Sequence, residues 1–172
     1  MSIPIRYLSY SLIIVLLQVM LFKHMALGTT IDPYIEVIIY PLLLIILPVN
    51  SPSGFVVLLG FICGMIIDYF YSTPGVHTSA LVFTAFIRKF ILNIVEPRTG
   101  YAVEATPLEI RTGGYWYYSF AAILLFLHIL IYNLVSFFSL TFMINILFKT
   151  LITFSISMLL IALHGMIWRS LR

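Results

Sequence analysis

Long apolar runs are the feature that most constrains this chain. Stretches such as 121–130 are apolar at every position except His128, and only 9% of the 172 residues are charged. A soluble domain carries about 25% charged residues, so this chain has too few charges to cover a globule in water. A membrane barrel would alternate apolar and polar residues along each strand. We therefore predict an all-α polytopic integral membrane protein.

Six hydrophobic segments are predicted to cross the membrane, because a helical span needs about 20 mostly apolar residues. The second segment is short and contains Pro41, so we expect it to kink or to be shielded by its neighbours. The fourth reaches Arg88 and Lys89 early, and we expect 90–95 to be interfacial or to project from the membrane. We predict one transmembrane domain over 1–172, with helices at about 6–27, 35–49, 55–71, 76–95, 115–138 and 142–168.

The distribution of basic residues predicts the topology. With six spans, Lys23 and Lys149 fall on one side of the membrane. The other side holds Arg6, Arg88, Lys89, Arg98, Arg111, Arg169 and Arg172. Because Lys and Arg accumulate on the cytoplasmic side, we predict that both termini and the polar loop 96–114 are cytoplasmic. These basic residues are too scattered to form a binding patch for nucleic acid, and we predict no nucleic-acid partner. The lipid bilayer is the expected environment of the chain.

Polar residues within the predicted helices are the candidates for function, since an ionisable group in hydrocarbon is costly. Asp68 is expected toward the outer leaflet, where it is hydrated near the interface or pairs with Lys23 or Lys149. The alternatives are that it contacts a partner, faces a cavity or relays protons. Arg88 is expected to extend to the lipid headgroups at the cytoplasmic end of a short helix, or to bind an anionic lipid or a partner's acidic group. His128 is expected to form a hydrogen bond with a neighbouring helix.

Motifs for catalysis are not visible in the sequence. There is no His-Glu-x-x-His zinc motif, no Gly-x-Ser-x-Gly elbow and no phosphate-binding loop. We therefore predict neither an enzyme nor a cofactor or metal site. Gly60 and Gly64 form a pair of small residues four apart, a spacing that allows another helix to approach closely.

The stretch Leu-Pro-Val-Asn-Ser-Pro-Ser-Gly-Phe, followed by Gly-Phe-x-x-Gly-x-x-x-Asp and Ser-Thr-Pro-Gly, lies within 47–80. This stretch resembles the MreD family of bacterial rod-shape-determining membrane proteins. The positions that carry the family pattern are Gly60, Phe61, Gly64, Asp68 and Gly75.

The resemblance implies a non-enzymatic component of the cell-elongation complex in the bacterial inner membrane, which supports peptidoglycan synthesis and cell shape. It implies a MreC-like bitopic partner, with MreB, RodA and its transpeptidase in the wider complex. It also implies a fold similar to the six-helix substrate-binding subunit of ECF-type vitamin transporters.

Two functions follow as alternatives. The first is a scaffold that binds a partner's membrane helix, with Gly60 and Gly64 allowing close approach and Asp68 supplying a polar contact. The second is the substrate-binding subunit of a small-molecule transporter, with Asp68 and His128 contacting the ligand. A homo-oligomer is compatible with either function.

Overall fold

The computed structural model of the chain describes residues 5–22, 36–98, 100–101, 106–108, 114–138, 141 and 143–170. Most of these residues are helical, and they contain no strand. In chain order the elements are α1 (Ile5–Leu17), the π-helix η1 (Gln18–Phe22), α3 (Leu42–Ile45), α4 (Ser53–Tyr71), α5 (Val76–Ile94), α6 (Gly114–Phe137) and α7 (Met143–Ser170). The predicted all-helical fold is therefore confirmed for the described part of the chain.

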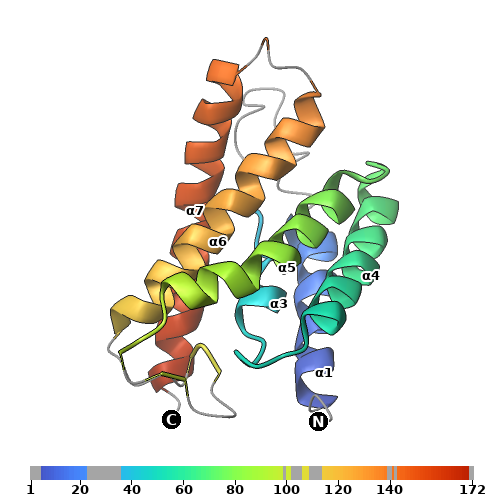
Figure 1. The fold of residues 1–172 in the computed structure, drawn as a ribbon. Coiled ribbons are helices and arrows are strands. Elements are labelled where there is room, and N and C mark those ends of the chain that lie inside the picture. The colour runs from blue at the N-terminus through green and yellow to red at the C-terminus, as the bar shows by residue number, and fades with distance from the viewer. Residues whose placement is uncertain are drawn as a thin grey trace.

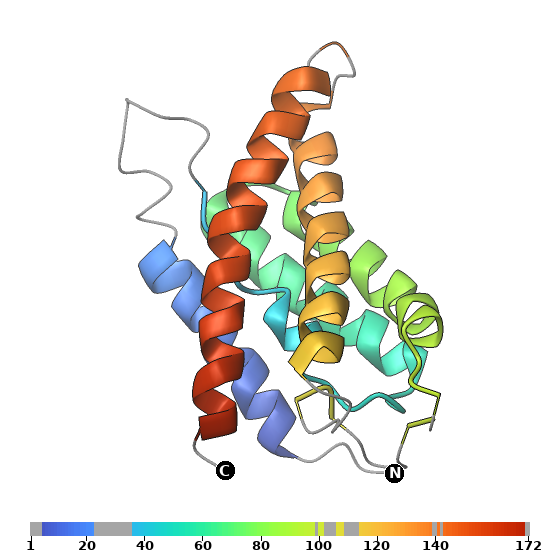
Figure 2. The same cartoon turned by 90° about the vertical axis from the view of Figure 1, so that its left-hand side faces the viewer.

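Helices that follow one another from α4 onward pack side by side and run in opposite directions (Figures 1 and 2). The short helix α3 lies inside the bundle, where it contacts α1, α5 and α6. The first turn of α1 and the last turn of α7 lie at the same end of the bundle (Figure 1). An even number of passes through the bundle produces this arrangement.

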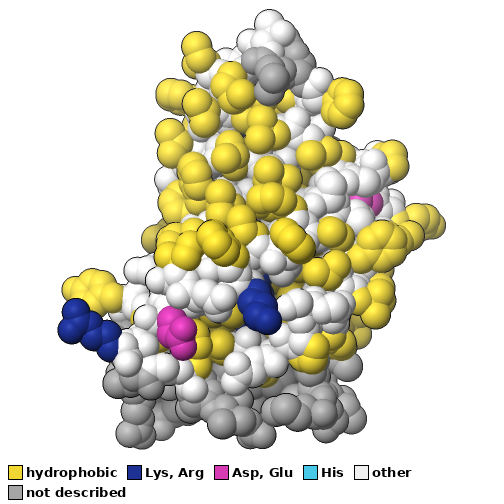
Figure 3. Space-filling view, in the orientation of Figure 1, with side chains coloured by type: hydrophobic (Ala, Val, Ile, Leu, Met, Phe, Trp, Pro, Cys, Tyr) yellow, Lys and Arg dark blue, Asp and Glu magenta, His cyan; other side chains and the backbone are white. Residues whose placement is uncertain are grey.

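Three of the described helices, α4, α6 and α7, are long and apolar enough to cross a membrane. Apolar side chains cover most of the face shown in Figure 3, and the charged side chains visible there lie mainly in its lower part. A soluble protein does not expose apolar surface on this scale. These features indicate a membrane protein, while the expectation of six spans stays a prediction.

The predicted helix over 35–49 is wrong for the residues that the structure describes there. Residues 36–39 are not helical, and only Leu42–Ile45 form a single α-helical turn. Proline lacks a backbone N–H and its ring clashes with the preceding turn, so Pro41 and Pro48 confine a helix to the few residues between them. We call residues 36–48 the buried segment.

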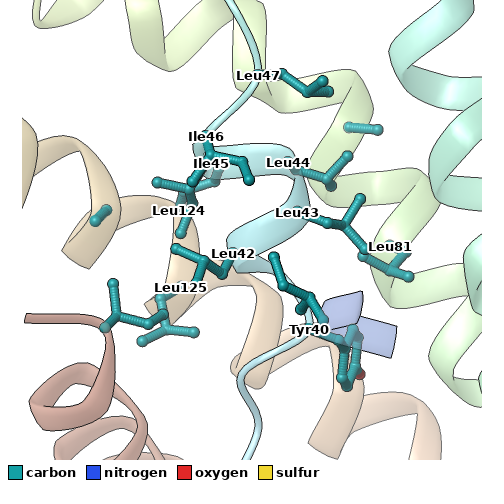
Figure 4. Close-up of a cluster of buried hydrophobic side chains, with 14 of the residues drawn as sticks. Tyr40, Leu42, Leu43, Leu44, Ile45, Ile46, Leu47, Leu81, Leu124 and Leu125 are labelled. Carbon is teal, nitrogen blue, oxygen red and sulfur yellow. The ribbon is translucent and has the colours of Figure 1, made fainter. Parts of the chain in front are cut away.

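The expected shielding of the buried segment by its neighbours is observed. Every residue from 40 to 47 is buried. In Figure 4, Leu43 and Leu44 point toward Leu81 of α5, while Leu42 and Ile45 lie beside α6. The centre of the hydrophobic core is therefore built on a stretch that is not itself a spanning helix.

Helix α5 does not end near Arg88. It continues to Ile94, and Ile91 and Leu92 are buried in the core. The observed end at Ile94 agrees with the predicted helix over 76–95, and the expectation that 90–95 is interfacial or projects from the membrane stays a prediction. The remaining observed bounds lie within two residues of the predicted ones, and the predicted continuation of the first helix over 23–27 lies outside the described residues.

Candidate functional site

The buried segment contains backbone groups that no helix satisfies. In a membrane, water is absent and each backbone N–H and C=O needs a partner inside the protein. Gln18 of η1 supplies two, since its Nε2 donates to the carbonyl of Val37 at 2.9 Å and its Oε1 accepts from the N–H of Ile39 at 2.9 Å. Ser157 of α7 accepts from the N–H of Ile38 at 2.9 Å. Side chains of η1 and α7 thus supply the partners that these non-helical backbone groups require.

Gln18 also links the buried segment to α4. Its Nε2 donates to the hydroxyl oxygen of Tyr71 at 2.9 Å, and the Tyr71 hydroxyl donates to the Gln18 carbonyl at 3.2 Å. Gln18 begins the π-helical turn, a local irregularity that is frequent at functional sites. One side chain therefore connects η1, the buried segment and α4.

Arg88 of α5 binds the other end of the buried segment. Its side chain is only 2% exposed, and its Nε donates to the carbonyl of Leu44 at 2.8 Å. Its Nη2 donates to the carbonyls of Leu47 at 2.6 Å and of Pro48 at 3.2 Å. A cation is favourable at the carbonyl end of a helical turn. The prediction that Arg88 extends to the headgroups is therefore wrong, because the carbonyls left free after α3 hold its guanidinium inside the bundle.

Asp68 of α4 accepts hydrogen bonds from the start of α5. Its carboxylate receives the backbone N–H of Gly75 at 3.0 Å, of His77 at 2.9 Å and of Thr78 at 3.0 Å. The hydroxyls of Thr78 and Thr73 donate to it at 2.6 Å and 3.2 Å. The first N–H groups of a helix have no partner within the helix and carry partial positive charge. Asp68 therefore joins the two helices by capping α5.

The expected ion pair between Asp68 and Lys149 is not formed. Lys149 Nζ instead lies 3.0 Å from Glu36 Oε2, at the start of the buried segment. The other partner considered for Asp68, Lys23, lies outside the described residues. The amide donors of α5 are the nearer partners of Asp68 because the turn that connects α4 to α5 places them directly beside the carboxylate.

The three glycines of the motif each meet a demand of the α4–α5 hairpin. A Cβ atom at Gly64 would lie 2.5 Å from the Cα of Thr78, and one at Gly60 would lie 3.2 Å from the carbonyl oxygen of Leu81. Gly75 has φ +86°, a backbone conformation that favours glycine. The predicted use of Gly60 and Gly64 as a surface for a partner helix is therefore wrong, because α5 of the same chain already packs against them.

Phe61 is the one motif residue with an exposed side chain. It is 45% exposed, next to Gly60 in sequence but on the outer face of α4. Exposed apolar side chains continue along this face at helical spacing, namely Leu58, Ile62, Met65, Ile66, Tyr69 and Phe70.

His128 of α6 belongs to a buried chain of hydrogen bonds. The Thr84 hydroxyl donates its only hydrogen to the carbonyl of Ala80 at 2.6 Å, so it accepts from Nδ1 of His128 at 2.8 Å. Nε2 of a neutral His128 is then an acceptor, and the Tyr40 hydroxyl donates to it at 2.9 Å. The Tyr40 oxygen in turn accepts from Nδ1 of His77 at 2.8 Å. This direction leaves Nε2 of a neutral His77 as an acceptor, and it has no partner among the described residues.

Glu36 and Lys149 form an ion pair close to this chain of hydrogen bonds. The Tyr132 hydroxyl donates to Glu36 Oε1 at 2.7 Å, and the Tyr132 ring lies 4.9 Å from that of His77. The Tyr71 ring lies 4.8 Å from the same histidine. Buried polar groups from η1, the buried segment, α4, α5, α6 and α7 therefore gather in one region, and we call it the polar core.

Sequence reasoning missed most of the polar core. It singled out Asp68 and His128, which lie in or beside this network, and Arg88, which binds the other end of the buried segment. The missed residues are Gln18, Glu36, Tyr40, Tyr71, His77, Tyr132 and Ser157. A usable signal was present, since Gln18 and Glu36 are polar residues inside or beside apolar runs, where a partner is required.

Two side chains bind the end of α5, Tyr101 from the polar loop 96–114 and Trp116 from the first turn of α6. The Tyr101 hydroxyl donates to the carbonyl of Leu92 at 2.6 Å, and Trp116 Nε1 donates to the carbonyl of Val95 at 2.6 Å. These are among the last carbonyls of a helix, which lack helical partners. Burial raises the pKa of Tyr101 to about 12, so its hydroxyl stays a donor to well above neutral pH.

Two grooves open on the described part of the molecule. One, of about 320 Å³, is polar and lies beside Asn50, Lys89 and Glu96. The other, of about 450 Å³, is apolar and lies between α1 and α7. No group of three or more His, Cys, Asp or Glu side chains that could hold a metal ion occurs among the described residues.

Comparison with protein-family models, with curated proteins and with solved structures gave no match. The fold and the polar core define a class nonetheless: an α-helical membrane protein whose bundle closes around a non-helical buried segment. The polar side chains of this core bind mainly backbone groups and one another.

Proposed function

We propose that the chain is a non-enzymatic membrane scaffold of the MreD type, which binds the membrane helix of a MreC-like bitopic protein. It acts in the cell-elongation complex of the bacterial inner membrane, together with MreB, RodA and its transpeptidase, and it supports peptidoglycan synthesis. The resemblance over 47–80 supports the family. The position of both described ends at one end of the bundle (Figure 1) supports a topology with both termini on the same side of the membrane, and the excess of basic residues predicted for that side supports the cytoplasm.

The observation that carries the proposal is the exposure of Phe61. The fold explains why the other four motif positions carry the residues they do. Gly60 and Gly64 allow α5 to approach, Asp68 caps α5, and Gly75 adopts a positive φ. The fold gives no such reason for an aromatic ring at the outer face of α4. Contact with another protein would explain the ring at this position, so we assign the outer face of α4 as the contact surface for the partner helix.

Packing chemistry in membranes agrees with this assignment. Lipid tails are as apolar as a leucine side chain, so helices associate through close packing rather than through the hydrophobic effect. A rigid ring that fits between small residues of a partner helix gains contacts that fluid lipid does not provide. Leu58, Met65 and Tyr69 extend the stripe above and below Phe61.

Affinity purification from native membranes tests this function. The tagged chain in mild detergent should recover a MreC-like protein and cell-wall synthases, identified by mass spectrometry. Phe61→Ala should lower recovery of the MreC-like protein several-fold. Phe86→Ala removes the same ring from an exposed site on α5, where the side chain is 77% exposed, and should leave recovery unchanged. Equal recovery by both variants would exclude the outer face of α4, and absence of any cell-wall protein would exclude the scaffold.

The polar core favours one alternative, the substrate-binding subunit of a small-molecule transporter. Ligand sites need several convergent polar groups, and Nε2 of His77 is a buried acceptor without a partner among the described residues. Asp68 and His128, the ligand contacts expected from the sequence, are instead engaged by protein groups. Recovery of a transporter ATPase pair, or of a small molecule that is lost in His77→Phe, would support this alternative over the scaffold.

A further inference from the structure

The apolar groove between α1 and α7 has two walls and a floor. The walls include Ile13 of α1 and Leu160 of α7, and the floor consists of Leu42 and Ile46 of the buried segment with the neighbouring Ile39. Figure 2 shows α7 on the near side of the bundle with the lower part of α1 beside it. In a membrane this groove faces lipid, and its floor reaches inward to the core.

The length of the groove matches one leaflet. Its lining runs along α1 and η1 from Tyr10 to Phe22, which is about 18 Å at a rise of about 1.5 Å per residue. The hydrocarbon core of a bilayer is about 30 Å thick, so one leaflet accounts for about 15 Å. A partner's spanning helix would need a groove about twice as long. The length therefore favours a ligand confined to one leaflet.

The volume favours a hydrocarbon chain over a helix. An apolar cavity of about 150 Å³ holds one benzene molecule, so about 450 Å³ holds about 18 carbon atoms. A helix with side chains is about 10 Å wide and rises about 5.4 Å per turn, so the same volume holds only about one turn. The groove is the size of one acyl chain.

One end of the groove is polar. Thr106 and His164 belong to its lining, and Nδ1 of His164 is buried without a partner among the described residues. The Tyr10 and Trp168 rings meet edge to face at 5.6 Å beside them, at the end where α1 begins and α7 finishes. Tyr and Trp are typical of the membrane–water interface. The apolar length and the polar end together match a lipid whose headgroup lies at this interface.

We propose that this groove binds one acyl chain of a membrane phospholipid, from the leaflet on the side where α1 begins. The chain lies along Ile13, Leu160 and the floor, and the headgroup of the same lipid lies at the end of the groove where Tyr10, His164 and Trp168 meet. The lipid fills the space between α1 and α7 that the described residues leave open. This groove is separate from the outer face of α4. A test of the lipid site therefore does not depend on whether a partner helix binds that face.

Native mass spectrometry after mild detergent extraction tests the site. The wild-type protein should retain one phospholipid, identified by mass. Ile13→Trp and Leu160→Trp fill the groove from opposite walls and should lower its occupancy about tenfold or more, because each displaces several methylene groups. Leu12→Trp and Leu159→Trp place the same side chain beside the groove on exposed positions and should retain the lipid. Retention by all four variants, or no phospholipid on the wild-type protein, would overturn the proposal.

A second measurement avoids substitutions in the groove. Trp116 and Trp168 are the two tryptophans of the chain, so Trp116→Phe leaves Trp168 at the polar end as the sole tryptophan, whose emission can be excited selectively over that of the tyrosines. Phospholipid with a brominated acyl chain, retained at one molecule per protein, should quench Trp168 in detergent. Full fluorescence at that occupancy would refute the site. A partner helix crosslinked to position 13 in native membranes would also refute it.

Discussion

Replacement of Arg88 by methionine tests whether one buried cation holds the end of the buried segment. The substitution removes three hydrogen bonds, to the carbonyls of Leu44, Leu47 and Pro48, and leaves these acceptors buried. Each unsatisfied buried acceptor costs about 1–3 kcal/mol. Relief of the desolvation of the guanidinium offsets part of this cost, since burial of an ion is itself unfavourable. We expect a net loss of about 3 kcal/mol in the free energy of unfolding, within the range of about 3–5 kcal/mol for breaking a buried charged contact.

Thermal unfolding in detergent measures this loss, with the folded fraction at each temperature determined by size-exclusion chromatography. For a chain of this length about 1 kcal/mol corresponds to about 2–4 °C in Tm, so Arg88→Met should lower Tm by about 6–12 °C. Arg88→Lys should fall between wild type and Arg88→Met, because a lysine keeps the charge but not the planar fork that reaches several carbonyls. Lys89→Met is the matched control, since it removes an exposed cation next in sequence. If Arg88→Met lowers Tm no more than Lys89→Met, the carbonyl contacts do not stabilise the fold.

Two further substitutions test the α4–α5 hairpin by the same assay. Asp68→Asn keeps the shape but weakens the charge-assisted bonds from the α5 amides, and should cost about 1–3 kcal/mol; an unchanged Tm would argue against the cap. Gly64→Ala places a Cβ atom 2.5 Å from the Cα of Thr78, and should cost about 1–3 kcal/mol by separating the two helices. Cys63→Ala, one position away and without such a clash, should have the smaller effect, and the reverse order would contradict the close approach.

The positions of the long helices could be predicted because hydropathy acts on a local scale. Runs of about 20 apolar residues must lie in the membrane wherever the rest of the chain goes, and the bounds of α4, α6 and α7 follow from the sequence within two residues. The same reasoning fails for 35–49, where the apolar run is real but two prolines prevent a helix. Apolar composition indicated burial of this stretch correctly and its backbone conformation incorrectly.

The partners of the polar residues could not be predicted, because they are distant in sequence and many are backbone atoms. Arg88 lies 44 residues from the Leu44 carbonyl that it binds, and Ser157 lies 119 residues from the Ile38 amide. Backbone acceptors have no signature in the sequence. Within the chain, the sequence therefore indicates only Lys23 and Lys149 as partners of Asp68, and it predicts Arg88 at the headgroups, where a cation without a visible counter-charge is expected.

The buried segment explains how α1 is held in the bundle. From α4 to α7 each helix packs along the next one, whereas the contacts of α1 and η1 are chiefly with one another, with α3 and with α4. Gln18 binds the segment at its start and Arg88 binds it at its end, so the segment connects the first helix to α5 without a helix–helix interface. A regular second helix would satisfy its own backbone groups and offer none to Gln18 or Arg88. The non-helical backbone, costly elsewhere in a membrane, is here the means by which the first helix is joined to the rest of the fold.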